Sequence, residues 1–187
     1  MISNSAKAGF DQLFMVALKG ALVAADGDRC DVAQIESQAG IKETQLVMLT
    51  SSSYVFRVFM LIYFQPNAQT REHFARRNRT TAADMSDAVF MDAICETGNM
   101  CCGAFNRDLS RVYPHVGLST PNVLDARCAE NLASLKAGHV RHFQVDINHN
   151  TLFHASLCVS EYADLDFSVD WLHTSDDSVG SGELELF

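Results

Sequence analysis

Residues 82–111 read AADMSDAVFMDAICETGNMCCGAFNRDLSR, and this stretch decides the fold. Thr81 to Asp84 resembles a capping box and Pro114 ends the pattern, so we predict a helix over about residues 82–111. Gly98 lies within the apolar stripe of this helix, where a missing side chain allows a close approach to a sheet. The stripe comprises Met91, Ile94, Cys95, Gly98, Cys102, Phe105 and Leu109.

The opposite side of the same helix is polar. Asp92, Glu96 and Asn99 fall within an arc of about 60° when successive residues are placed about 100° apart. Gly103 and Asn106 extend this face. Carboxylates at helical spacing are common on solvated faces, so the spacing alone indicates the wet side of an amphipathic helix.

The other segments predict an α+β domain with a mostly antiparallel sheet packed against two long helices. We expect one domain over residues 1–173, and an acidic tail or edge strand over 174–187. Gly27 suits the left-handed C-cap of the first helix, and Pro121 makes its segment an edge strand or loop. The predicted elements are a helix over 5–25, strands over 30–35, 44–51 and 54–64 (the last two a hairpin), a short helix over 69–77, an extended segment over 116–124, and a hairpin of 139–147 and 151–161 that turns at Asn148-His149-Asn150.

Composition excludes several classes of function. A formal net charge of −9 argues against nucleic-acid binding, and Arg57 interrupts the longest apolar run, so we expect no membrane span. The six cysteines form no CxxC pair, which predicts no metal site, reduced thiols and a cytoplasmic location. The seven histidines are scattered with no Ser or Cys elbow nearby, and we expect them at the surface. No glycine-rich phosphate loop occurs, so no cofactor of the protein's own is expected.

A wider pattern surrounds the polar face. Asp92-x3-Glu96-x2-Asn99, followed after a gap by Pro121, resembles the signature of the CheC/CheX family of chemotaxis phosphatases. The local text at residues 96–100 and 117–121, and the order of elements over about residues 5–165, are also similar to that family. No other glutamate is followed by asparagine three residues later, and a single ExxN site favours the CheX-like branch.

The resemblance implies a phosphatase that dephosphorylates the aspartyl phosphate of a CheY-like response regulator. Asn99 would position the attacking water, and Glu96 would grip a lysine of the regulator, with Asp92 and Pro121 in supporting roles. The regulator would supply the Mg²⁺, and the branch implies a homodimer. These residue types suit the chemistry, because phosphoryl transfer needs mostly positioning and a neutral amide adds no charge beside the phosphoryl group.

Two other functions stay open at this point. The same face could belong to a non-catalytic module that recruits a response regulator or a flagellar-switch component. A purely structural role would instead engage Glu96 and Asn99 in the protein's own dimer contacts. The sequence leaves open which regulator is bound, whether the pathway is chemotaxis, and what the acidic tail does.

Overall fold

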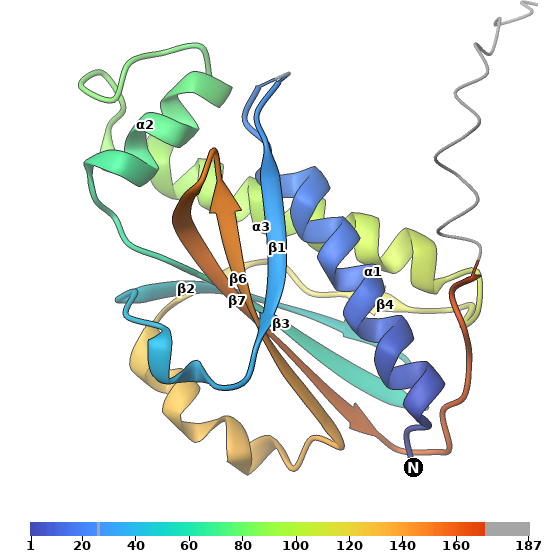
Figure 1. Ribbon diagram of the computed structural model, residues 1–187. Coiled ribbons are helices and arrows are strands. Elements are labelled where there is room, and N and C mark those ends of the chain that lie inside the picture. Colours follow the sequence, from blue (N-terminus) through green and yellow to red (C-terminus); the bar gives the residue numbers. More distant parts are fainter. Residues whose placement is uncertain (26, 171–187) are drawn as a thin grey trace, which may run out of the picture.

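The computed structural model describes residues 1–25 and 27–170 and has the predicted α+β architecture, with the sheet on one side of two long helices (Figure 1). Both predicted hairpins are confirmed, and the turn between the last two strands places Asn148 and His149 at positive φ. In chain order the elements are α1 (Asn4–Leu22), β1 (Cys30–Ile35), the 3₁₀ helix η1 (Gln38–Gly40), β2 (Gln45–Ser52), β3 (Phe56–Phe64), α2 (Ala68–Arg77), α3 (Asp87–Leu109), β4 (Gly117–Leu118), β5 (Asn122–Asp125), the 3₁₀ helix η2 (Ala126–Leu135), β6 (His139–Ile147) and β7 (Asn150–Glu161).

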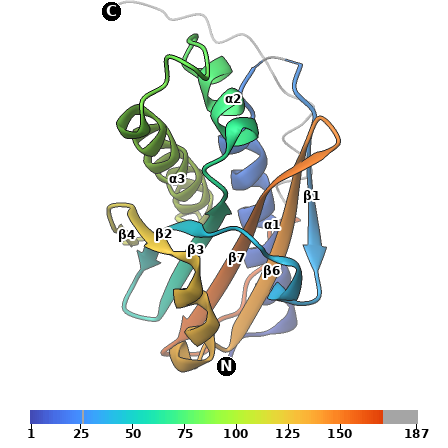
Figure 2. The same ribbon diagram turned by 90° about the vertical axis from the view of Figure 1, so that its left-hand side faces the viewer.

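Seven antiparallel strands form one sheet in the described part of the chain, in the order β1-β6-β7-β3-β2-β4, with β5 also paired to β2. Helices α1 and α3 cover one face of this sheet and enclose the main hydrophobic core (Figure 1). The segment before β2 and helix η2 lie over the other face, where a smaller apolar cluster includes Leu61 and Tyr63 (Figure 2). Strand β3, which is almost wholly apolar, is therefore covered on both faces.

Helix α3 lies directly against β2 at Gly98. A Cβ atom added at this glycine would stand 2.7 Å from Cδ1 of Leu49 and 3.4 Å from Cγ2 of Val47. The predicted close approach is confirmed, and it places α3 directly against β2.

Two predicted helix ends were wrong. Helix α3 begins later than expected, because the Ser86 side chain is its N-cap and accepts a hydrogen bond from the Val89 amide at 3.3 Å. Thr81 and Asp84 form a separate turn, closed by the Asp84 amide on the Thr81 hydroxyl at 3.2 Å. Helix α1 ends at Leu22, so Gly27, with φ +95°, belongs to the following turn and not to the C-cap.

No local sequence pattern predicts the segment that closes the core at the N-terminus. The Ser3 amide donates to the Leu165 carbonyl at 3.0 Å, and the Leu165 amide donates to the Met1 carbonyl at 2.9 Å. Phe167 then packs edge-on against Phe10, with the ring centroids 5.0 Å apart. The predicted boundary at 173 and the acidic tail lie outside the described residues.

Candidate functional site

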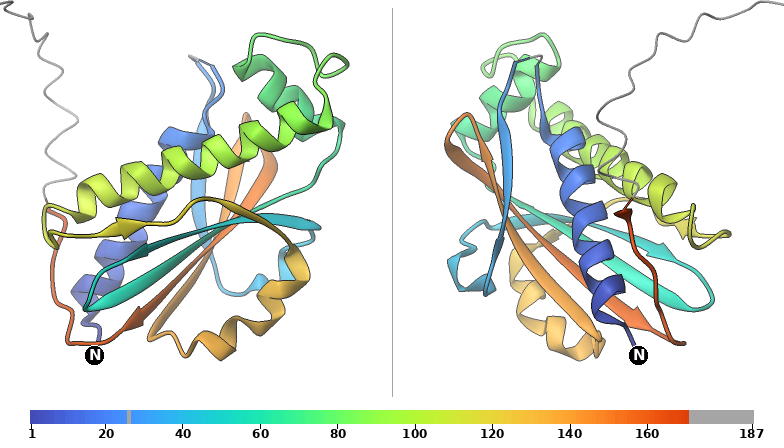
Figure 3. Two further views of the ribbon diagram at one scale, coloured as in Figure 1. Left: turned by 180° about the vertical axis from the view of Figure 1, so that it is seen from behind. Right: turned by 45° about the vertical axis from the view of Figure 1, so that its right-hand side comes forward.

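The polar face of α3 is exposed along the middle of the helix, which lies on the outside of the molecule (Figure 3). Asp92, Glu96 and Asn99 are exposed and Gly103 is half-buried; we call these four residues the α3 strip. Within the described residues, no hydrogen bond or ion pair engages the side chains of Glu96 or Asn99. A purely structural role inside one chain would have tied these groups to neighbouring residues.

The N-terminal half of the α3 strip is anionic. Asp92 and Glu96 stand one turn apart on the helix, a spacing at which like charges repel each other. Burial raises the pKa of the neighbouring Cys95 thiol, and the charge of Asp92 adds to this effect. No bond joins Asp92 to Glu96 in the described structure, so the two carboxylates together suit a cationic group supplied from outside.

The strip ends at Gly103, one turn earlier than the sequence suggests. Asn106 turns inward, because its side-chain carbonyl accepts a hydrogen bond at 3.3 Å from the hydroxyl of Ser51, which is fully buried on β2. At Gly103 an added Cβ would meet no atom within 4 Å. On the polar face, the turn at Gly103 therefore carries no side chain, and there is room beside the backbone there.

The predicted proline segment lies at the sheet edge beside this helix. Strands β4 and β5 both pair with β2, and half-buried Pro121 stands in the break between them. The hydroxyl of Ser119 accepts a hydrogen bond from the Thr50 amide at 2.9 Å, and the Ser119 amide donates to the Thr50 carbonyl, also at 2.9 Å. Strand β4 contacts α3, and Leu118 is 49% exposed. Fold and pairing thus bring the two parts of the ExxN–proline pattern to one side of the molecule.

Solved structures share this arrangement of sheet and helices. The chemotaxis protein CheX from Vibrio vulnificus superposes with a TM-score of 0.61 at 15% identity, over 81% of this chain and 99% of that one. The chain has the CheX-like fold. The CheX of a CheX–CheY–BeF3–Mg complex from Borrelia burgdorferi matches with a TM-score of 0.60 at 11% identity, over 81% and 98% of the two chains. A CheC-like superfamily protein from Shewanella sp. PV-4 matches with a TM-score of 0.58 at 13% identity, over 81% and 97%.

These likenesses confirm the predicted CheC/CheX resemblance at the level of the fold. No protein-family model and no curated protein sequence matches the chain. No helix among the described residues is long and apolar enough to cross a membrane.

Three histidines of this CheX-like chain are buried, contrary to the expectation that they lie at the surface. His139 Nε2 lies 2.7 Å from Asp11 Oδ1, and His154 Nδ1 lies 2.6 Å from Glu43 Oε1. His73 packs against aromatic rings, and burial lowers its pKa from 6.5 to about 4. Each has an interior role that local sequence does not reveal, and none belongs to the α3 strip.

The six cysteines are free thiols, as predicted, and they differ in burial. Cys101 and Cys102 are buried on the core side of α3, whereas Cys128 is exposed. Burial raises the pKa of Cys102 to about 11, which keeps the thiol protonated and unreactive. Among residues 1–25 and 27–170 there is no group of three or more potential metal ligands.

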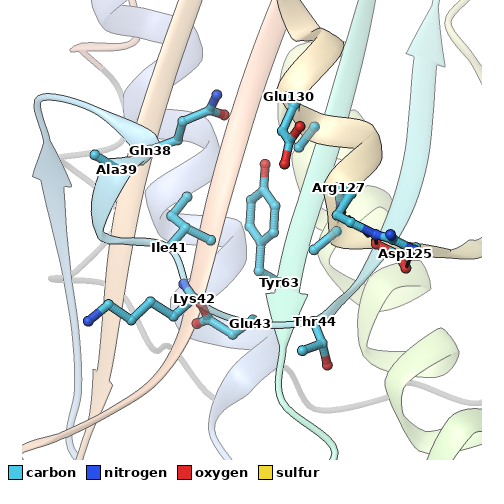
Figure 4. A pocket seen from close by; sticks show the side chains of 12 residues that line it. Gln38, Ala39, Ile41, Lys42, Glu43, Thr44, Tyr63, Asp125, Arg127 and Glu130 are labelled. Atoms are coloured by element: carbon cyan, nitrogen blue, oxygen red, sulfur yellow. Dashed lines mark hydrogen bonds and ion pairs between the residues drawn. The ribbon is translucent and has the colours of Figure 1, made fainter.

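A cavity of about 420 Å³ lies on the other face of the sheet, between residues 38–44 and the start of η2 (Figure 4). The ring of Tyr63 stands in its centre, and burial raises the pKa of this phenol to about 12. The phenol oxygen accepts a hydrogen bond from Ser156 at 3.1 Å. No residue of α3 lines this cavity, so the α3 strip lies apart from it.

Proposed function

We propose that this CheX-like protein is a phosphatase for the aspartyl phosphate of a CheY-like response regulator. The observation that carries the proposal is the pair Glu96 and Asn99, exposed three residues apart on α3 and free of bonds within the described chain. The fold supports it, since a protein of this fold is known in a complex with CheY, BeF3 and Mg.

Asn99 is the residue that would position the attacking water. In the reaction the water oxygen bonds to phosphorus while the bond from phosphorus to the aspartyl oxygen breaks, which gives inorganic phosphate and a free carboxylate. The Asn99 carbonyl accepts a hydrogen bond from the water and directs its lone pair along the line of attack. The Mg²⁺ held by the regulator neutralises charge on the phosphoryl oxygens, so the phosphatase needs no metal of its own.

Glu96 is the residue that would hold the regulator. The carboxylates of Asp92 and Glu96 form an anionic stretch that attracts a lysine ammonium group of the partner. Because Glu96 lies about one turn before Asn99, an ion pair at Glu96 fixes how far the helix enters the regulator's active site. Asp92 contributes charge to this grip, and Pro121 keeps the neighbouring sheet edge short beside the helix.

The proposal is tested with the response regulators of the source organism, each phosphorylated by a small phosphodonor and incubated with wild-type protein. We expect Asn99→Ala to lower the rate of dephosphorylation by about a hundredfold, since a misplaced reactant costs that much. Glu96→Ala should weaken both binding and turnover. Asn99 is exposed, so the Asn99→Ala variant should unfold at the same urea concentration as the wild type. Wild-type turnover by Asn99→Ala would show the assigned mechanism to be wrong.

The second candidate function is a non-catalytic module that recruits a regulator or a flagellar-switch component. It uses the same exposed strip and requires binding without acceleration of phosphate loss. Pull-down with phosphorylated and unphosphorylated regulator, run beside the rate assay, separates the two functions.

The homodimer implied by the resemblance belongs to the same proposal. Strand β1 pairs with β6 on one side alone within the described residues, so its other edge is available to a second subunit. Sedimentation equilibrium gives the mass in solution, and a monomer at all concentrations would remove this part of the proposal.

A further inference from the structure

Arg77, the last residue of α2, reaches the turn of α3 that carries the candidate site. Its Nη1 donates to the Ala21 carbonyl at 2.7 Å and to the Thr97 hydroxyl at 3.0 Å, and its Nη2 contacts the sulfur of Met100. Thr97 is buried and directly follows exposed Glu96. Because Thr97 is two residues before Asn99, the guanidinium group of Arg77 contacts the helical turn that carries Asn99. Figure 3 shows α2 beside the N-terminal half of α3.

Within the described residues no carboxylate faces Arg77, unlike most other arginines of the chain. Within the described residues its partners are a carbonyl, a hydroxyl and a thioether, and none is a carboxylate. Arg79, two residues later, is exposed and also lacks a carboxylate partner in that part of the chain. The arginines that do face a carboxylate are Arg29, Arg71, Arg76, Arg107, Arg111, Arg127 and Arg141.

Arg77 also has unused hydrogen-bond donors. A guanidinium group carries five N–H donors, and the bonds within the chain use two on Nη1 and one on Nη2. Nε–H and the second Nη2–H remain, and donors on these two nitrogens can hold a carboxylate or a phosphoryl group through two oxygens. The half-buried side chain is already ordered by its bonds to α1 and α3, so binding an anion costs little conformational entropy.

We propose that Arg77 is a partner-binding residue that takes an oxyanion, a carboxylate or a phosphoryl group, of the docked regulator. This inference rests on the proposed function, since the regulator presents the phosphoryl group and the carboxylates that hold its Mg²⁺. Glu96 then receives a cation and Arg77 an anion of the same partner. Two opposite charges on neighbouring parts of one surface set the orientation of docking, which a single ion pair would leave free to rotate.

The test measures binding of the response regulator that the wild type binds most tightly, at low and high salt. We expect Arg77→Gln to weaken binding by about tenfold or more and to make it less dependent on salt, because a charge-assisted hydrogen bond is lost. Arg77→Lys keeps the charge but loses the paired donors, so its affinity for the regulator should lie between those of the wild type and Arg77→Gln. The matched control is Arg57→Gln, which also removes an arginine with no carboxylate partner among the described residues; Arg57 is exposed. Arg57 lies on β3 between inward-facing Phe56 and Val58, so it points to the other face of the sheet.

A second control separates binding from a positioning effect. Thr97→Val removes the hydrogen bond from Arg77 to the Thr97 hydroxyl, and it leaves the contact with Met100 and the positive charge in place. Nearly wild-type affinity in this variant supports the inference. If Thr97→Val weakens binding as much as Arg77→Gln does, Arg77 acts by holding α3 and the inference is overturned.

The phosphorylated and unphosphorylated forms of the regulator identify the anion. A loss of affinity confined to the phosphorylated form assigns the phosphoryl group to Arg77, and an equal loss for both forms assigns a carboxylate. Wild-type affinity in Arg77→Gln overturns the inference even where Asn99→Ala abolishes turnover. Conversely, turnover that survives Asn99→Ala removes the catalytic proposal while the affinities still decide the role of Arg77. A wild type that binds no regulator overturns both.

Discussion

The contact between Gly98 and β2 makes a quantitative prediction about how α3 is held. Gly98→Ala places a methyl group 2.7 Å from Cδ1 of Leu49, a distance at which one of the two must move. Gly103→Ala adds the same methyl group to the same helix where no atom lies within 4 Å. The two substitutions share the gain in helix propensity and differ in packing, so the second is a control for the first.

The magnitudes follow from these two effects. Replacing glycine by alanine inside a helix stabilises the folded protein by about 0.5–1 kcal/mol. Forcing an extra methyl group into a packed contact costs about 1–3 kcal/mol. Gly103→Ala should therefore raise the free energy of unfolding by about 0.5–1 kcal/mol. Gly98→Ala should leave it unchanged or lower it by up to about 2.5 kcal/mol.

Urea unfolding followed by circular dichroism measures both variants against the wild type. The slope of the transition should stay the same, so that a change in its midpoint reports stability. If Gly98→Ala stabilises the protein as much as Gly103→Ala does, α3 is not pressed against β2 at this point. The rate of dephosphorylation is a second readout, because a displaced α3 also displaces Asn99, whereas Gly103→Ala affects only the docking surface.

Two further predictions concern the core. His73 has its pKa lowered by burial from 6.5 to about 4, so the unfolded chain takes up a proton at a higher pH than the folded protein does. Stability should therefore fall by up to about 3 kcal/mol as the pH drops from about 6.5 toward 4, and His73→Leu should flatten this fall in urea titrations at pH 7 and pH 5. Phe167→Ala should lower the free energy of unfolding by about 3–5 kcal/mol, because the ring packs on Phe10 and Tyr113 at the N-terminal end of the core. The melting temperature checks this, and an unchanged value would mean that residues 164–169 do not close the core.

Local sequence patterns predict the elements whose structure depends on residues close together in the sequence. The spacing of apolar residues gave α3, and the turn at Asn148-His149 gave the last hairpin, because both signals lie within one element. The N-terminus of α3 was misplaced because Thr81 and Ser86 both have capping chemistry, and only packing decides between them. Helix η2 was missed, since a 3₁₀ helix lacks the 3.6-residue spacing on which helix prediction relies.

The buried polar groups could not be predicted because their partners are distant in sequence. His139 bonds to Asp11, 128 residues away, and His154 bonds to Glu43, 111 residues away. Arg77 is a similar case, since its acceptors Ala21 and Thr97 come from two other helices. Exposure of Glu96 and Asn99 was predictable from helical spacing, whereas the charge beside them required the fold.

On the proposed function, α3 would serve a reaction that depends on positioning. The backbone of α3 is held on two sides, by the close contact of Gly98 with β2 and by Arg77, which bonds to α1 and to Thr97. The side chain of Asn99 has no bond inside the described chain, so it keeps its donors and acceptor for the water and the partner. The rigid backbone would set the place where the water is held. The side-chain amide of Asn99, which has no bond within the described chain, would be available to hold it. On the proposed function, the regulator would supply the metal and the phosphoryl group. The site would then be complete only in the complex, and hydrolysis would require docking.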